Sequence, residues 1–168
     1  MDFIELEKAR YSVRQFKADP VPDELLQTLL EAARLAPTAK NTQDFRVYVL
    51  RSPEALAKAA DCTPCLYGAP LALIFCCDRS GSVRIPINSV DFPQMDAAIV
   101  MCHVMLAAAA SGLGSCWVGF FDEAKTRAAF AIPDDLQPVG FLPLGYAAAG
   151  PSENHEASRQ PEDLFVTV

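Results

Sequence analysis

Four basic side chains stand close together near the start of the chain, and their spacing suits the binding of an anion. Lys8, Arg10, Arg14 and Lys17 fall in a ten-residue stretch without an acidic residue, although the whole protein carries a net charge of −7. If this stretch is extended, Arg10, Ser12 and Arg14 point to one side and present two guanidinium groups and a hydroxyl together. Arginine binds phosphate through paired hydrogen bonds and keeps its charge. The pattern predicts a small-molecule phosphate site; the alternative is a solvated charged surface.

A second candidate phosphate site is the glycine-rich segment at residues 112–115 (GLGS). A dinucleotide-binding glycine loop follows a strand and opens a helix. Here the glycines follow a predicted helix and precede a predicted strand, so the end of a helix and a tight turn explain them. The order of elements excludes a Rossmann-type site.

The cysteines offer a third kind of chemistry. Cys62 and Cys65 have the spacing of a thioredoxin-like redox pair, but that motif depends on a helix N-terminus, and this pair precedes a strand and is expected in a loop. There is no second CxxC motif, and the two histidines are far apart in sequence, so we predict no metal site. The six cysteines are expected to be reduced, buried side chains. A thiol redox protein using Cys62 and Cys65 remains an alternative.

No residue is predicted to act as a catalyst on its own. His103 falls inside an apolar helix and His155 in a polar tail, and no Ser-His-Asp or Cys-His arrangement can be proposed from spacing. If the protein is an enzyme, a cofactor is expected to supply its chemistry.

The elements that must position these residues follow from periodicity and turn residues. We expect helices at 2–9, 22–35, 53–60, 91–111 and 123–130, and strands at 45–50, 71–77, 115–119 and 137–146. Helices that alternate with strands predict an α/β or α+β sheet flanked by helices. The helix at 91–111 is apolar around most of its circumference, which predicts burial in the domain or against another subunit.

Length and composition limit the other possibilities. A chain of 168 residues, 51% hydrophobic and 21% charged, is expected to form one domain over 1–168. The sequence pI near 4.7 lacks the basic surface that nucleic acids require. The first twenty residues hold no apolar stretch, and the apolar run at 97–110 is shorter than the roughly 20 residues of a bilayer span. We therefore expect a cytoplasmic protein without nucleic-acid or membrane partners.

Three blocks of the sequence, taken together and in this order, resemble the nitroreductase family of flavoproteins. They are residues 7–16 (EKARYSVRQF), 36–43 (APTAKNTQ) and 112–119 (GLGSCWVG). Two shorter matches, at 144–146 (LGY) and 159–161 (RQP), extend the resemblance over nearly the whole chain.

The resemblance implies an α+β fold with a central, mostly antiparallel sheet flanked by helices and a long buried helix at the interface of a homodimer. It also implies two FMN sites per dimer, each shared between the subunits. Arg10, Ser12 and Arg14 would hold the phosphate and ribityl end, together with Arg159 from the tail. The partner subunit would contribute Pro37, Thr38, Ala39, Asn41 and Gln43, and Cys116, Trp117, Val118 and Gly119 would line the flavin ring, with the N–H near Gly119 facing N5.

By the same resemblance, NADH or NADPH would reduce the flavin at N5, and an electron-poor acceptor such as a nitroaromatic or a quinone would then accept the hydride. The protein would supply position and electrostatics without a titrating catalyst. Two alternatives stay open: a specialised flavin reductase such as a dehalogenase, and a flavin-binding or regulatory module without turnover.

Overall fold

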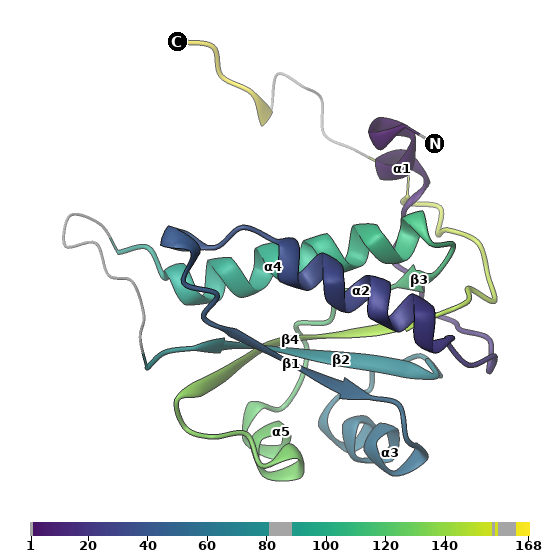
Figure 1. Ribbon diagram of the computed structural model, residues 1–168. Helices are drawn as coiled ribbons and strands as arrows, with labels where there is room; N and C mark the ends of the chain where they lie inside the picture. Colours follow the sequence, from purple (N-terminus) through teal and green to yellow (C-terminus); the bar gives the residue numbers. More distant parts are fainter. Residues whose placement is uncertain (1, 81–88, 156, 158–163) are drawn as a thin grey trace.

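A four-stranded sheet with every neighbouring pair antiparallel lies at the centre of the fold (Figure 1). The computed structural model describes residues 2–80, 89–155, 157 and 164–168. The strand order is β1-β2-β4-β3. The strands are β1 (Phe45–Leu50), β2 (Leu71–Asp78), β3 (Gly114–Ser115) and β4 (Leu136–Gly145). The predicted α+β class with an antiparallel sheet is confirmed.

Helices cover both faces of this sheet, so the molecule has three layers. Figure 1 shows α2 (Asp23–Leu35) and α4 (Phe92–Ala110) on one face, and α3 (Pro53–Cys62) and α5 (Glu123–Phe130) on the other. The helix α1 (Phe3–Ala9) lies near the C-terminal end of α4, and a short 3-10 turn, η1 (Ala39–Asn41), follows α2.

The central strand β2 explains why both layers are held together. Its seven residues from 71 to 77 are all buried. Because side chains alternate across a strand, the odd-numbered residues 71–75 pack among α2 and α4, and the even-numbered residues 72–76 pack among α3 and α5. The prediction of a strand covered on both faces is confirmed.

The long helix α4 buries one face in its own chain. Val100, Met101 and Val104 pack against the sheet and α2, whereas Met95 is 41% exposed and Leu106 is partly exposed on other faces. By length and composition α4 could also cross a membrane. Its packing on the sheet accounts for the apolar residues of one face. The sequence predicted burial in the domain or against another subunit, and within a single chain only this one face is buried.

The strand predicted at 115–119 is shorter in the structure. Regular pairing of β3 ends at Ser115, and only Val118 forms a further bridge, to Phe141. Gly119 and Phe120 then lead away from the sheet toward the cap of α5. The predicted strand is therefore an edge segment with interrupted pairing.

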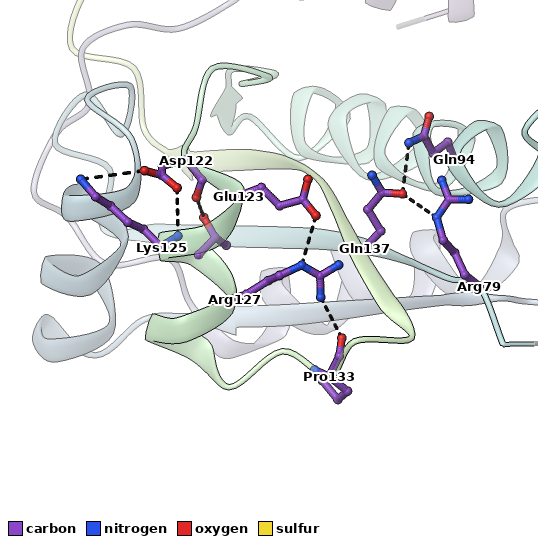
Figure 2. Close-up of polar contacts among 9 residues, drawn as sticks. Arg79, Gln94, Asp122, Glu123, Lys125, Arg127, Pro133 and Gln137 are labelled. Carbon is purple, nitrogen blue, oxygen red and sulfur yellow. Dashed lines mark hydrogen bonds and ion pairs between the residues drawn. The ribbon is translucent and has the colours of Figure 1, made fainter.

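A set of polar contacts ties the ends of these elements together (Figure 2). The side-chain oxygen of Gln137 on β4 accepts from Arg79 after β2 at 2.5 Å and from Gln94 on α4 at 3.3 Å. On α5, Arg127 pairs with Glu123 at 3.1 Å and donates to the carbonyl of Pro133 at 3.0 Å. These contacts fix the sheet relative to its helices, and no residue predicted for cofactor binding takes part in them.

Candidate cofactor site in two halves

The basic segment at 10–14 lies extended alongside β3. Arg10 ends α1, and Ser12 forms a parallel bridge with Ser115. The N–H of Val13 donates to the carbonyl of Ser115 at 2.9 Å. Val13 is buried, whereas Ser12 and Arg14 are exposed, as alternation along an extended chain requires.

Gly114 allows the segment to lie this close to β3. A Cβ atom at this position would stand 2.5 Å from Cγ2 of Val13, well inside van der Waals contact. Gly112 has φ of +76°, the left-handed conformation of a glycine that ends a helix. Helix termination therefore explains Gly112, as expected. Gly114 has a different role, because a residue without a side chain is needed there for the basic segment to pack against β3.

The segment at 116–119 continues from β3 and exposes alternate residues. Cys116 donates from its N–H to the carbonyl of Pro143 at 3.3 Å, and Val118 exchanges two backbone hydrogen bonds of 2.9 Å with Phe141. Cys116 and Val118 are buried, whereas Trp117 is 38% exposed and Gly119 is exposed. A Cβ on Gly119 would meet nothing within 4 Å, and among the described residues none accepts a hydrogen bond from its N–H.

The backbone contacts of Ser12 and Val13 with Ser115 bring the first and third sequence blocks together. Burial raises the pKa of the Cys116 thiol, while the Arg14 guanidinium and the Ser12 hydroxyl beside it oppose that rise. The thiol is therefore neutral at pH 7. The first half-site, defined as Arg10, Ser12, Arg14 and residues 116–119, thus presents basic and polar donors around a buried cysteine.

This half-site lies at the C-terminal end of α4. A cavity of about 190 Å³ opens beside it, between α1, the end of α4 and β3. Ala109 and Gly114 line this cavity, and Arg10 is the residue that it shares with the half-site. The tail reaches the same place, because His155 packs edge-on against Tyr11 and bonds the carbonyl of Lys8 at 2.9 Å. Arg159, the predicted contribution of the tail, lies outside the described residues.

The second half-site is the turn at 37–43, which holds Pro37, Thr38, Ala39, Asn41 and Gln43. The hydroxyl of Thr38 accepts from the N–H of Gln43 at 3.0 Å, and the Gln43 amide donates to Asn41 at 3.2 Å. Lys40, Asn41 and Gln43 all have positive φ, between 54° and 56°. Such conformations are strained for residues other than glycine and gather at ligand-binding sites.

A buried carboxylate fixes this turn to α4. Asp96 is 3% exposed, and its Oδ2 accepts a hydrogen bond of 2.9 Å from the N–H of Ala39. Burial raises the pKa of Asp96, the Ala39 hydrogen bond lowers it, and the nearby Asp44 raises it. Sequence reasoning missed Asp96, although a single carboxylate in an apolar helix was a usable signal.

The two half-sites stand at opposite ends of α4. Asp96 holds the second near the start of the helix, and Ala109 borders the cavity beside the first near its end. Thirteen residues at about 1.5 Å each separate them by about 20 Å along the axis. Figure 1 shows the same separation, with η1 and β3 at opposite ends of α4. One chain therefore brings 10–14 and 116–119 together but leaves 37–43 apart.

The cysteine pair does not have the geometry of a redox motif. Cys62 is the last residue of α3, where it is buried and its thiol contacts the carbonyl of Lys58 at 3.2 Å. The redox motif places its first cysteine at a helix N-terminus, whereas Cys62 stands at a helix C-terminus. All six cysteines are free thiols. The prediction placed the pair in a loop, which holds for Cys65 but not for Cys62.

The fold is a three-layer α+β architecture in which one apolar helix separates two groups of the residues predicted to bind a cofactor. Residues 8–65 and 62–146 match the model of the Nitroreductase family. The chain is 36% identical over 160 residues to a protein of Methanothermobacter thermautotrophicus that carries the provisional name NADH dehydrogenase/NAD(P)H nitroreductase, covering 90% of this chain and 80% of that protein. The chain belongs to the Nitroreductase family, a family of oxidoreductases.

Solved structures agree with this assignment. A nitroreductase family protein from Clostridium difficile 630 superposes with a TM-score of 0.92 at 36% identity, covering 99% of this chain and 98% of that one. An FMN-dependent nitroreductase from Clostridium difficile R20291 superposes with a TM-score of 0.80 at 25% identity, covering 96% and 94%.

Proposed function

We propose that the protein is an FMN-dependent oxidoreductase of nitroreductase type that acts as a homodimer. It takes reducing equivalents from NADH or NADPH and passes them to a small electron-poor acceptor such as a nitroaromatic or a quinone. The family and the FMN-dependent structural relative support the cofactor, and the provisionally named relative supports the nicotinamide. We also infer that residues 1–168 act as one soluble domain, with the cytoplasm as its compartment.

The observation that carries this proposal is the division of the predicted site between the two ends of α4. Helix α4 carries apolar side chains outside its buried face, including Ile99 and Leu106, that are only partly covered by the rest of the chain. A two-fold axis near the middle of α4 would place the start of one helix beside the end of its copy. Each 37–43 turn would then complete the first half-site of the other chain.

The residues of the first half-site fit FMN by their donor chemistry. Arg10, Ser12 and Arg14 supply guanidinium and hydroxyl donors, and the stretch 8–17 that holds them contains no acidic residue. At the other end of this half-site, the N–H of Gly119 has no acceptor among the described residues, and the position that a Cβ of Gly119 would occupy is open. A dianionic phosphate at one end and a planar ring at the other match this distribution of donors.

When bound, FMN supplies the hydride chemistry, and this chain supplies position and charge. Arg10, Ser12 and Arg14 would hold the phosphate and ribityl end through their guanidinium and hydroxyl donors. The N–H of Gly119 would be a hydrogen-bond donor to the flavin ring. Cys116 would line the site as a neutral thiol, and the proposal assigns no proton transfer to a side chain.

The first test is the visible absorption spectrum of the purified protein with FMN, before and after NADH or NADPH is added without oxygen. The proposal predicts a yellow protein that is bleached by at least one of the two nicotinamides. A yellow protein that neither bleaches would indicate a binding module, and a colourless protein that does not take up FMN would refute the site.

A mixing experiment tests the sharing of sites between subunits. Arg14→Gln damages the first half-site and Asn41→Ala the second, and each is expected to be weak alone. Heterodimers formed by refolding the two variants together contain one undamaged site, so part of the FMN binding should return. Mixed protein that binds FMN no better than the two variants separately would refute the shared arrangement.

A further inference from the structure

The turn at 37–43, which forms the second half-site, is joined to the rest of the chain at few points. It begins after α2, and just beyond its end the carbonyl of Asp44 accepts a hydrogen bond of 2.9 Å from the N–H of Asp78 on β2. Between these points the hydrogen bonds stay within the turn and the two residues after it, with one exception among the described residues. The N–H of Ala39 donates to Oδ2 of Asp96 at 2.9 Å.

The backbone of the turn makes such a tether necessary. Lys40, Asn41 and Gln43 have φ between 54° and 56°. Residues other than glycine are strained in this conformation, and they keep it only where the surrounding structure holds them. If the N–H of Ala39 were released, the turn could relax, and the amide groups of Asn41 and Gln43 would lose their fixed direction.

Asp96 lies where a carboxylate is unfavourable. It is buried on α4 beside the apolar residues Ala97 and Val100, and the N–H of Ala39 is its hydrogen-bond donor among the described residues. An aspartate is almost never fully buried unless it is paired, because burying a charged group costs free energy that hydrogen bonds must offset. Packing of the core therefore does not account for Asp96, whereas the tether to the turn does.

The tether also joins the turn to the helix that we propose as the subunit interface. Asp96 stands three residues before Ile99, so the two side chains are neighbours along α4, and Ile99 is only partly covered within one chain. In the proposed dimer, α4 sets the position of each chain relative to its partner. A turn bonded to α4 is therefore held in place before FMN binds, which avoids the free energy of ordering it on binding.

We propose that Asp96 is a positioning residue for FMN, whose carboxylate holds the N–H of Ala39 and thereby presents the turn at 37–43 to the first half-site of the partner subunit. The inference rests on the proposed function, because it takes this turn to bind FMN across the dimer. Asp96 itself needs no contact with the flavin.

The test compares Asp96→Ala with Asp96→Asn, read out as the dissociation constant of oxidised FMN from flavin fluorescence, without reductant. Alanine removes the acceptor, and we expect it to weaken FMN binding about tenfold, the low end of what a hydrogen bond to a charged group contributes. Asparagine keeps an acceptor oxygen for Ala39 and should restore most of the lost affinity.

Thr126→Ala is the matched control, because it also removes a buried polar side chain. The hydroxyl of Thr126 donates to the carbonyl of Asp122 at 2.7 Å on α5, which lies on the other face of the sheet. This variant should bind FMN like the unchanged protein, whatever its melting temperature.

Mixed dimers, formed by refolding two variants together, show which half-site Asp96 serves. Asp96→Ala should regain part of its FMN binding when it is mixed with Arg14→Gln, because their heterodimer has one site with both halves intact. It should regain none when it is mixed with Asn41→Ala, because both changes damage the second half-site. A general loss of stability would affect both mixtures alike.

Several results would overturn the inference alone. They are an Asp96→Ala protein with unchanged FMN affinity, an Asp96→Asn protein as weak as Asp96→Ala, and mixtures in which Asp96→Ala regains binding equally with both partners or with neither. These results count against the inference alone when Arg14→Gln and Asn41→Ala restore each other. If those two variants do not restore each other, or if the unchanged protein binds no FMN, the proposed function fails and the inference fails with it.

Discussion

Gly114→Ala should test whether Val13 of the basic segment packs as closely against residue 114 as the structure indicates. The added Cβ would stand 2.5 Å from Cγ2, 3.1 Å from Cβ and 3.3 Å from Cγ1 of Val13. Carbon atoms prefer about 3.5–4.0 Å. Rotating Val13 cannot relieve the contact, because its own Cβ is too close and a β-branched side chain has few rotamers. The backbone of the basic segment must therefore move.

The expected cost is that of an overpacked core, about 1–3 kcal/mol. For a protein of this length it corresponds to a fall of about 2–12 °C in the melting temperature. Because Ser12 and Arg14 flank Val13, FMN should also bind more weakly. Circular dichroism melting and urea unfolding measure the first effect, and flavin fluorescence titration the second.

Val13→Ala in the same chain provides the internal check. Alone, it removes two buried methyl groups and should cost about 2 kcal/mol. Combined with Gly114→Ala, it makes room for the new methyl group. The double variant should therefore lose less stability than the sum of the two single losses, by about 1 kcal/mol or more. A Gly114→Ala protein that melts within 1 °C of the unchanged protein, or strictly additive losses, would refute the reasoning.

Three further predictions follow from the site. Gly119→Ala should leave the melting temperature unchanged but weaken FMN binding, because its Cβ enters open space where the ring is proposed to lie. Gly150→Ala, whose Cβ also enters open space, should change neither the melting temperature nor FMN binding. A lower melting temperature for Gly119→Ala would contradict this prediction. Asp96→Asn should flatten the dependence of stability on pH. Burial raises the pKa of Asp96 above its ordinary value of about 3.9, so the carboxyl stays protonated to a higher pH in the folded state than in the unfolded chain. The free energy of unfolding therefore falls as pH rises from about 4 through the folded pKa. Urea unfolding at several pH values measures this, and parallel curves for the two proteins would argue against it. Replacing both Cys62 and Cys65 by serine should preserve FMN binding and turnover, whereas a thiol redox protein would lose its activity.

Local sequence patterns predicted most of the fold because most elements have clear periodicity and clear ends. The strand at 45–50 and the helix at 123–130 were predicted with the bounds that the structure shows. The helix predicted at 53–60 continues to Cys62, since nothing in the sequence between Ala60 and Thr63 marks its end. Only the length of β3 was clearly overestimated. A segment with strand-forming residues at the edge of a sheet pairs over its whole length only if a partner strand faces all of it.

The site was predictable only in part, because its contacts join residues far apart in sequence. Alternation from Arg10 to Arg14 predicts the exposed donors, and the resemblance supplies the other segments. The contacts of Thr63 with Phe120 and of Asp96 with Ala39 each span 57 residues, so no local pattern reveals them. Gly114 had a plausible local explanation as part of a turn, and only the packed fold reveals its contact with Val13.

If each site takes groups from two chains, as we propose from the half-sites at opposite ends of α4, cofactor binding and subunit association are linked equilibria. FMN then favours the dimer by the same factor by which the dimer favours FMN. Dilution should then release flavin even when the intrinsic affinity of the complete site is high. Each tenfold increase in association caused by FMN corresponds to about 1.4 kcal/mol of coupling. The colour of the protein thereby becomes a measure of its quaternary structure.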